Sequence, residues 1–219
     1  MSKSPCVTAF LLCILLAGCE AVPGDAAFRL GYYQNAAKLY EQQYTLGNAE
    51  AGLRLADMYS LGMGVTLDAK KAFDIYQTLA DKKIVLAEHN VGVCYEYGKG
   101  TEIDYKKAEE WYRNAARQGY NPSIYNLGTL YANDRIAPRN DIEGLTLLLE
   151  AAELVDGNDP RSIFVREDQA GHVKRMLTRM TTEDIGKAKL QAAERARELR
   201  ARSGGPIQGA YPLSGSGLQ

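Results

Sequence analysis

The chain has 219 residues, of which 46% are hydrophobic and 24% are charged. This composition is typical of a globular protein and excludes wholesale disorder. The formal net charge of −1 argues against a protein that binds nucleic acid by neutralising phosphates, so we expect no nucleic-acid partner.

Residues 1–18 have the pattern of a secretory signal peptide. Lys3 supplies a positive charge, and residues 7–17 are almost wholly apolar but too few to span a bilayer comfortably. The segment ends in Leu16-Ala17-Gly18-Cys19, which resembles the lipobox of bacterial lipoproteins. This resemblance implies that the peptide is cut just before Cys19, and that the sulfur of Cys19 carries a diacylglyceryl group with fatty acids such as palmitate.

Cys19 is therefore expected to be the lipid attachment site, with residues 19–25 forming a lipidated linker. Position 20 is glutamate rather than aspartate. Similarity to the sorting rules of enteric bacteria then implies an outer membrane lipoprotein that faces the periplasm and contacts the membrane through its lipid. An ordinary signal peptide, or a core helix that happens to end in cysteine, is the alternative interpretation.

Between residues 48 and 155, side chains of the same kind return every 36 positions. The rows include Tyr59, Tyr95 and Tyr131; Leu55, Val91 and Leu127; Ala80, Ala116 and Ala152; and Asp68, Asp104 and Asn140. A period of this length is typical of arrays built from one repeated supersecondary unit. This part of the chain is therefore predicted to consist of three stacked units.

Each unit is predicted to contain two helices. Residues 86–97 place apolar side chains on the stripe typical of an amphipathic helix, and Gly98-Lys99-Gly100 ends it. Asp104 is predicted to cap a second helix that covers about residues 105–117. The side chains expected to be buried on this second helix are those of Ala108, Trp111, Tyr112, Ala115 and Ala116.

Three segments resemble the SEL-like repeat, a branch of the tetratricopeptide superfamily. They are Leu-Gly-Met-Gly-Val at 61–65, Asp-Tyr-Lys-Lys-Ala at 104–108, and Trp-Tyr at 111–112 followed by Ala-Ala-Arg-Gln-Gly at 115–119. The resemblance implies an all-α fold, a right-handed α-solenoid of stacked antiparallel helix pairs. The third unit carries Asp134 and Ile136 in place of the loop glycines, so its loop is expected to differ in shape.

Both ends of the array are expected to be capped, because terminal repeats need a polar outer face. Residues 26–47 align with part of a unit and are predicted to form an N-terminal cap half-repeat. Residues 156–202 are predicted to form a C-terminal helical cap, in which Thr182 caps the last helix. The alternative is that this helix packs on a partner instead. Residues 203–219 are rich in glycine and serine and are predicted to be a disordered tail. The helices expected within the C-terminal cap cover residues 161–179 and 183–202.

The residues that could carry catalysis each have a packing interpretation. His89 and His172 are the two histidines of the sequence, and they lack the spacing of a zinc site. Cys94 lies on an apolar stripe, which favours a buried small hydrophobic residue over a nucleophile. Asp68 and Asp104 recur with the repeat as helix caps. We therefore predict a protein that is not an enzyme, with no catalytic residue, no metal site and no cofactor, and no small-molecule substrate is evident.

The resemblance to SEL-like repeat proteins implies a protein–protein interaction scaffold or adaptor. Combined with the lipobox, it implies that the partner is an envelope protein complex, such as polysaccharide-export or secretion machinery. The alternative is a cell-wall or polysaccharide-binding protein, or an enzyme with an unrecognised site. A third hypothesis is self-assembly, because short solenoids can stack end to end.

Overall fold

The computed structural model describes residues 22–154 and 161–203, and every element within them is a helix. The predicted helices over 86–97 and 105–117 are confirmed to within one residue. The elements in chain order are α2 (Asp25–Arg29), α3 (Tyr33–Thr45), α4 (Ala49–Leu61), α5 (Ala69–Asp81), α6 (Val85–Tyr97), α7 (Tyr105–Arg117), α8 (Asn121–Ala132), α9 (Asp141–Leu154), α10 (Arg161–Leu177) and α11 (Thr182–Ser203).

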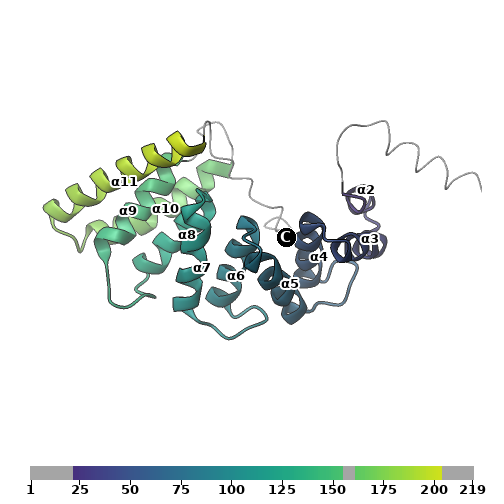
Figure 1. Cartoon of the computed structure of the whole chain (residues 1–219). Coiled ribbons are helices and arrows are strands. Elements are labelled where there is room, and N and C mark those ends of the chain that lie inside the picture. Colours follow the sequence, from purple (N-terminus) through teal and green to yellow (C-terminus); the bar gives the residue numbers. More distant parts are fainter. Residues whose placement is uncertain (1–21, 155–160, 204–219) are drawn as a thin grey trace, which may run out of the picture.

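The helices pack in consecutive pairs that are stacked along one direction (Figure 1). The pairs α4 with α5, α6 with α7, and α8 with α9 correspond to the three predicted units, and each helix also contacts the next one along the chain. This arrangement confirms the predicted right-handed α-solenoid of antiparallel helix pairs.

Repeated polar residues begin the second helix of each unit, as predicted. The side chains of Asp68 and Asp104 accept hydrogen bonds from backbone N–H groups in the first turns of α5 and α7, at 2.8 and 3.0 Å. Asn140 does the same for the N–H of Glu143 in α9, at 3.0 Å. Each bond satisfies a donor that the start of a helix would otherwise leave without a partner.

Glycines allow close contact between the loops and the preceding units. Gly100 has a φ of +73°, and a Cβ atom at this position would lie 2.1 Å from the carbonyl oxygen of Ala69. Gly64, 36 residues earlier, approaches the backbone of Tyr33 in the same way. The equivalent residue in the third unit is Ile136, which cannot approach a neighbouring backbone so closely, and its side chain is buried instead.

Small residues and tyrosines fill the space between helices. Ala72, Ala80 and Ala108 are almost completely buried, as the repeat pattern predicts. The prediction was wrong for two residues of α7, because Trp111 and Ala116 are only partly buried. Ala116 remains accessible because it lines an open groove toward the C-terminal end of the array, described below.

The tyrosine at the centre of α5 and of α7 is buried but keeps a polar partner. The hydroxyl of Tyr112 donates a hydrogen bond to Glu96 at 2.6 Å, and that of Tyr76 donates to Asp57. Tyr40 in the N-terminal α3 repeats the arrangement with Asp25, at 2.7 Å. These bonds remove the cost of burying an unpaired hydroxyl, so a large aromatic ring can occupy the core.

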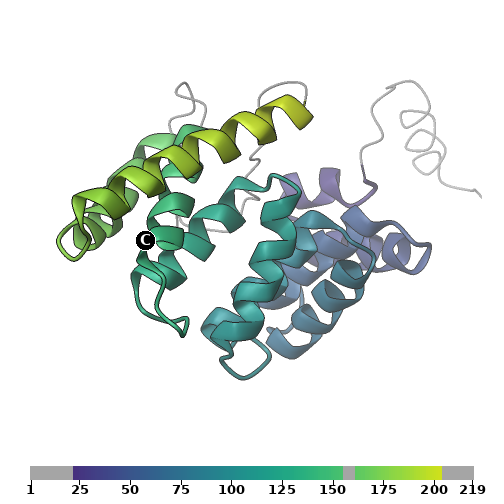
Figure 2. The same ribbon diagram turned by 60° about the vertical axis from the view of Figure 1, so that its left-hand side comes forward.

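The last helix, α11, packs along α9, the second helix of the third unit (Figure 2). Its contact face is built from Ala188, Ala192 and Ala196, which are completely buried and spaced by one helical turn. Thr182 was predicted to cap α11, but the cap is Thr181, whose hydroxyl oxygen accepts a hydrogen bond from the N–H of Asp184 at 3.1 Å. Within the described ranges, no helix is both long and apolar enough to cross a membrane.

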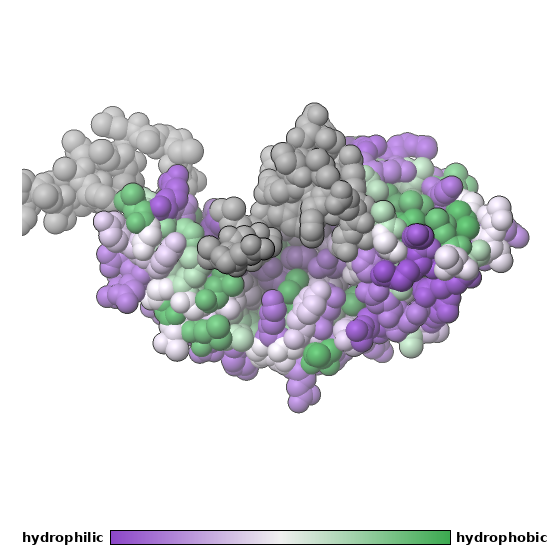
Figure 3. All heavy atoms as spheres, turned by 180° about the vertical axis from the view of Figure 1, so that it is seen from behind, coloured by the Kyte–Doolittle hydropathy of each residue, from purple (hydrophilic) through white to green (hydrophobic). Residues whose placement is uncertain are grey.

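Exposed hydrophobic side chains also follow the repeat. Leu61 and Tyr97 are 36 residues apart, as are Leu67 and Ile103, and all four are exposed. On the face shown in Figure 3, hydrophobic side chains lie in separate patches among hydrophilic ones. Such scattered exposure is ordinary for a protein surface and identifies no single binding face.

Candidate functional site

An open cavity of about 210 Å³ lies where α7, α8, α9 and α11 meet. We call it the α11 groove. Ile124, Leu127, Leu147 and Leu199 give it apolar walls, and charged side chains from α7, α9 and α11 stand among them. Because three helices come from the second and third units and one from the C-terminal segment, the groove exists only when α11 is docked.

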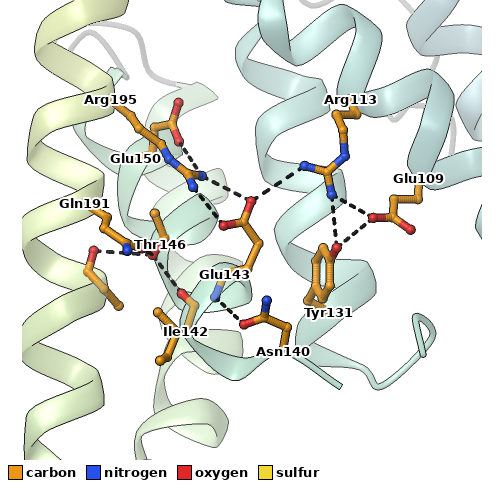
Figure 4. Close-up of polar contacts among 11 residues, drawn as sticks. Glu109, Arg113, Tyr131, Asn140, Ile142, Glu143, Thr146, Glu150, Gln191 and Arg195 are labelled. Carbon is orange, nitrogen blue, oxygen red and sulfur yellow. Dashed lines mark hydrogen bonds and ion pairs between the residues drawn. The ribbon is translucent and has the colours of Figure 1, made fainter. Parts of the chain in front are cut away.

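Glu143 on α9 is the centre of the charged network in this groove (Figure 4). Its carboxylate accepts two hydrogen bonds from the guanidinium of Arg195 on α11, at 2.8 and 3.1 Å. On the other side, Arg113 on α7 lies 3.7 Å from Glu143. The side chain of Glu143 is only 16% exposed, so the solvent screens these interactions less than it would at an open surface. One carboxylate therefore connects the second unit to the last helix.

Arg113 is held by a second set of partners. Its guanidinium donates to Glu109 at 2.7 Å and to the hydroxyl oxygen of Tyr131 at 3.0 Å, while Tyr131 itself donates to Glu109 at 2.6 Å. Burial and the neighbouring carboxylate raise the pKa of Tyr131 to about 12. The hydroxyl therefore stays protonated and acts as a fixed hydrogen-bond donor.

Glu150, two helical turns after Glu143, has a different environment. The residue is 5% exposed, and its Oε2 atom has no hydrogen-bond partner. The nearest cation is Arg195, 3.9 Å away. Burial raises the pKa of Glu150 from 4.5 to about 7, and the positive charge of Arg195 opposes this effect only in part.

The histidines, which were the catalytic candidates considered from the sequence, lie in packing environments. The ring of His89 packs against Tyr112 and Tyr120, and its Nδ1 atom lies 2.9 Å from the hydroxyl of Ser123. Burial lowers the pKa of His89 to about 4. Although a serine beside a histidine is the pairing used in nucleophilic catalysis, Ser123 is completely buried, so a substrate cannot reach it. His172 packs against Tyr125 on α8.

The remaining predicted residues either have structural roles or lie outside the described ranges. Cys94 is buried, and burial raises the pKa of its thiol to about 11, which opposes nucleophilic reactivity at neutral pH. Among the residues that the structure describes, no three His, Cys, Asp or Glu side chains gather as metal ligands. Cys19, the expected lipid attachment site, lies outside the described residues, as does the predicted tail after residue 203.

The α11 groove was not predicted from the sequence, although the repeat contains a signal for it. In the first two units, Lys71 and Lys107 place their ammonium groups over the rings of Tyr59 and Tyr95, at 4.2 and 5.1 Å from the ring centroids. The equivalent residue 36 positions later is Glu143, so the third unit reverses the charge at this position. A change from lysine to glutamate in an otherwise regular row indicates that the side chain at this position has a different neighbour in the third unit.

Sequence comparison identifies the repeat. The family model described as "Sel1 repeat" matches residues 24–36, 49–83, 85–120 and 121–156, which is more than half of the chain. The chain belongs to the Sel1 repeat family. Sel1 repeat proteins generally mediate protein–protein interactions through a scaffold that is generally not catalytic. No curated protein matches the sequence.

Two solved structures share the Sel1 solenoid. A Sel1 repeat protein from Oxalobacter formigenes is 22% identical, with a TM-score of 0.54 and 83% of each chain covered. A protective antigen of uropathogenic Escherichia coli strains, which displays an SLR fold, is 21% identical with a TM-score of 0.52. That match covers 90% of this chain but 51% of the antigen, so the chain spans about half of the antigen's length. At these identities the similarity establishes the fold alone.

Proposed function

We propose that this Sel1 repeat protein is a membrane-anchored periplasmic lipoprotein that acts as a protein–protein interaction scaffold or adaptor for an envelope complex, such as polysaccharide-export or secretion machinery. The observation that carries the proposal is a Sel1 solenoid preceded by the sequence Leu16-Ala17-Gly18-Cys19. The solenoid supplies an extended surface for a partner, and the lipidated cysteine would attach the protein to a membrane.

A lipid tether would assist the scaffold in a simple physical way. Each buried methylene of an acyl chain contributes about 0.8 kcal/mol to membrane binding, so several acyl chains on Cys19 give stable anchoring. An anchored scaffold meets a membrane-bound partner at a raised effective concentration. A moderate intrinsic affinity between the solenoid and its partner is then sufficient.

The anchor is tested by replacing Cys19. Cells that express the wild type or Cys19→Ala are grown with labelled palmitate, and the purified proteins are compared for incorporated label. The wild type is expected to carry label and to fractionate with membranes, whereas Cys19→Ala carries none. Equal labelling of the two proteins would show that the anchor assignment is wrong.

The scaffold role is tested by mild crosslinking in cells followed by affinity purification of the lipidated protein. Recovery of one envelope complex in stoichiometric amounts would support the proposal. Retention on purified glycan, without any protein partner, would overturn it in favour of a cell-wall or polysaccharide binder. Growth of particle size with concentration in light scattering, again without a partner, would favour self-assembly.

A further inference from the structure

Six exposed hydrophobic side chains lie in or next to the connections between the paired helices α2 and α3, α4 and α5, and α6 and α7. They are Leu30, Tyr32, Leu61, Leu67, Tyr97 and Ile103, and each is between 47% and 72% exposed. Because α2 and α3 pair as the helices of a unit do, all three connections lie on the same side of the solenoid. We call this side the loop edge.

The loop edge is continuous, because each connection packs against the preceding one. A Cβ atom on Gly64, in the connection between α4 and α5, would lie 2.3 Å from the carbonyl carbon of Tyr33. Gly100, in the connection between α6 and α7, approaches the carbonyl oxygen of Ala69 in the same way. The exposed hydrophobic side chains of the three connections therefore form one row along the array.

The row ends in the third unit. The positions that follow Tyr97 and Ile103 by 36 residues are Asn133 and Arg139, which are polar. The hydrophobic residue of this connection, Ile136, is buried. The exposed hydrophobic side chains of the loop edge are thus confined to the N-terminal part of the array.

The charge of the loop edge changes along the array in the same direction. Residues 62–71 and 98–107 together contain five lysines and three acidic residues, whereas residues 134–143 contain two arginines and three acidic residues. The ammonium group of the exposed Lys99 lies 5.7 Å from the centroid of the Tyr97 ring. Leucine, tyrosine and long basic side chains are the combination found on surfaces that rest at the boundary between water and lipid.

Exposure alone identifies no binding face, but the position of the proposed lipid anchor indicates what could cover this one. Cys19 precedes Val22 by three positions, and Val22 is already buried in the core. Three residues of extended chain span at most about 11 Å. A lipidated Cys19 would therefore hold the end of the array that carries Leu30 and Tyr32 close to the bilayer surface.

We propose that the loop edge lies on the surface of a lipid bilayer, with Leu30, Leu67 and Ile103 inserted among the headgroups and the neighbouring lysines facing anionic lipids. This inference rests on the proposed lipid anchor and adds an orientation to it. The two units nearest the tether face the membrane, and the third unit, which lacks the exposed hydrophobic side chains and the excess of lysine, remains accessible to a protein partner.

The test places one tryptophan on the loop edge and another away from it. Trp111, the single tryptophan of the sequence, is first replaced by phenylalanine. Leu67→Trp then reports on the loop edge. Leu190→Trp, on α11 at the other end of the array (Figure 1), is the matched control, because both leucines are 63% exposed. The lipidated proteins are purified from membranes and reconstituted in vesicles of phosphatidylethanolamine and phosphatidylglycerol whose acyl chains are brominated near the headgroup.

Bromine quenches tryptophan fluorescence only on close approach, so quenching reports insertion into the lipid. Because an interfacial apolar face is buried about 5–10 Å into the boundary between headgroups and acyl chains, Leu67→Trp should be quenched and its emission shifted to shorter wavelength. Leu190→Trp should keep the emission of a tryptophan in water. Equal quenching of the two variants, or no quenching of either in vesicle-bound protein, would overturn the proposal. Circular dichroism checks the fold, and Ile103→Trp repeats the test if Leu67→Trp does not fold.

The anchor and the loop edge can fail separately. If the protein carries palmitate and floats with vesicles but Leu67→Trp is not quenched, the loop edge assignment is wrong and the anchor stands. If the chain carries no lipid but Leu67→Trp is quenched on added vesicles, the anchor is wrong and the loop edge stands. If the chain carries no lipid and does not float, both are wrong. Crosslinking of residue 67 to an envelope protein, without quenching by lipid, would show that the loop edge binds protein instead.

Discussion

Replacing Glu150 with glutamine should make the protein more stable at neutral and alkaline pH. The pKa of Glu150 is raised from 4.5 to about 7 by burial, so between these pH values the folded state binds a proton that the unfolded state releases. Stability is therefore lost as the pH rises through about 7, where the buried carboxylate must ionise. A difference of about 2.5 between the two pKa values corresponds to about 3 kcal/mol, since each pKa unit is worth about 1.4 kcal/mol.

Glutamine cannot ionise, so Glu150→Gln removes this penalty. The variant and the wild type should have similar free energies of unfolding near pH 4, and the variant should gain up to about 3 kcal/mol near pH 8. The assay is urea denaturation followed by circular dichroism at a series of pH values between these limits, with the titration of the Glu150 side chain measured by carboxyl NMR. Glu194→Gln changes the net charge by the same amount, and subtracting its pH profile isolates the buried carboxylate.

His89 changes the stability of the fold over the same pH range, but in the opposite direction. Burial lowers its pKa to about 4, so the stability that neutral His89 provides is present above its unfolded pKa of 6.5 and is lost as the pH falls. In the wild type the two residues oppose one another, and Glu150→Gln should reveal a stability that increases from pH 4 to 6.5. A stability difference between Glu150→Gln and the wild type that does not change with pH would refute the reasoning.

Three further predictions concern the repeats. Gly100→Ala should destabilise the array by about 2 kcal/mol or more in thermal denaturation, because the new Cβ atom would meet the carbonyl oxygen of Ala69. Gly31→Ala has a similar positive φ but open space around it, so it should show only the conformational cost of about 1 kcal/mol, and equal losses would contradict the packing argument. Asp104→Ala should cost about 1 kcal/mol by removing a helix cap, whereas Asp104→Asn, which keeps an acceptor oxygen, should recover most of it. The thiol of Cys94 should react with iodoacetamide far more slowly in native protein than in urea, since burial raises its pKa to about 11; fast labelling of the folded chain would show that the site is open.

The regular part of the fold could be predicted because each unit repeats the same local physics. Asp104 begins α7 and Gly98 ends α6 with a φ of +67°, as their residue types suggest. The cap of α11 was predicted one residue too late, because Thr181 and Thr182 are adjacent and both suit a cap, and only the backbone geometry distinguishes them. The burial of Ala116 was also predicted wrongly, because an open groove lies where α7, α8, α9 and α11 meet and leaves this residue partly accessible.

The groove itself could not be predicted from the repeat, because it depends on a helix outside the repeated pattern. The positions equivalent to Glu150 in the first two units are Thr78, which is exposed, and Asn114, which is partly buried. A polar residue at position 150 therefore fits a surface site by the repeat rule alone. The side chain becomes buried because α11 packs over α9 and brings Arg195 toward it. The same polar position thus acquires its raised pKa and its unsatisfied oxygen from tertiary packing, which the repeat pattern does not encode.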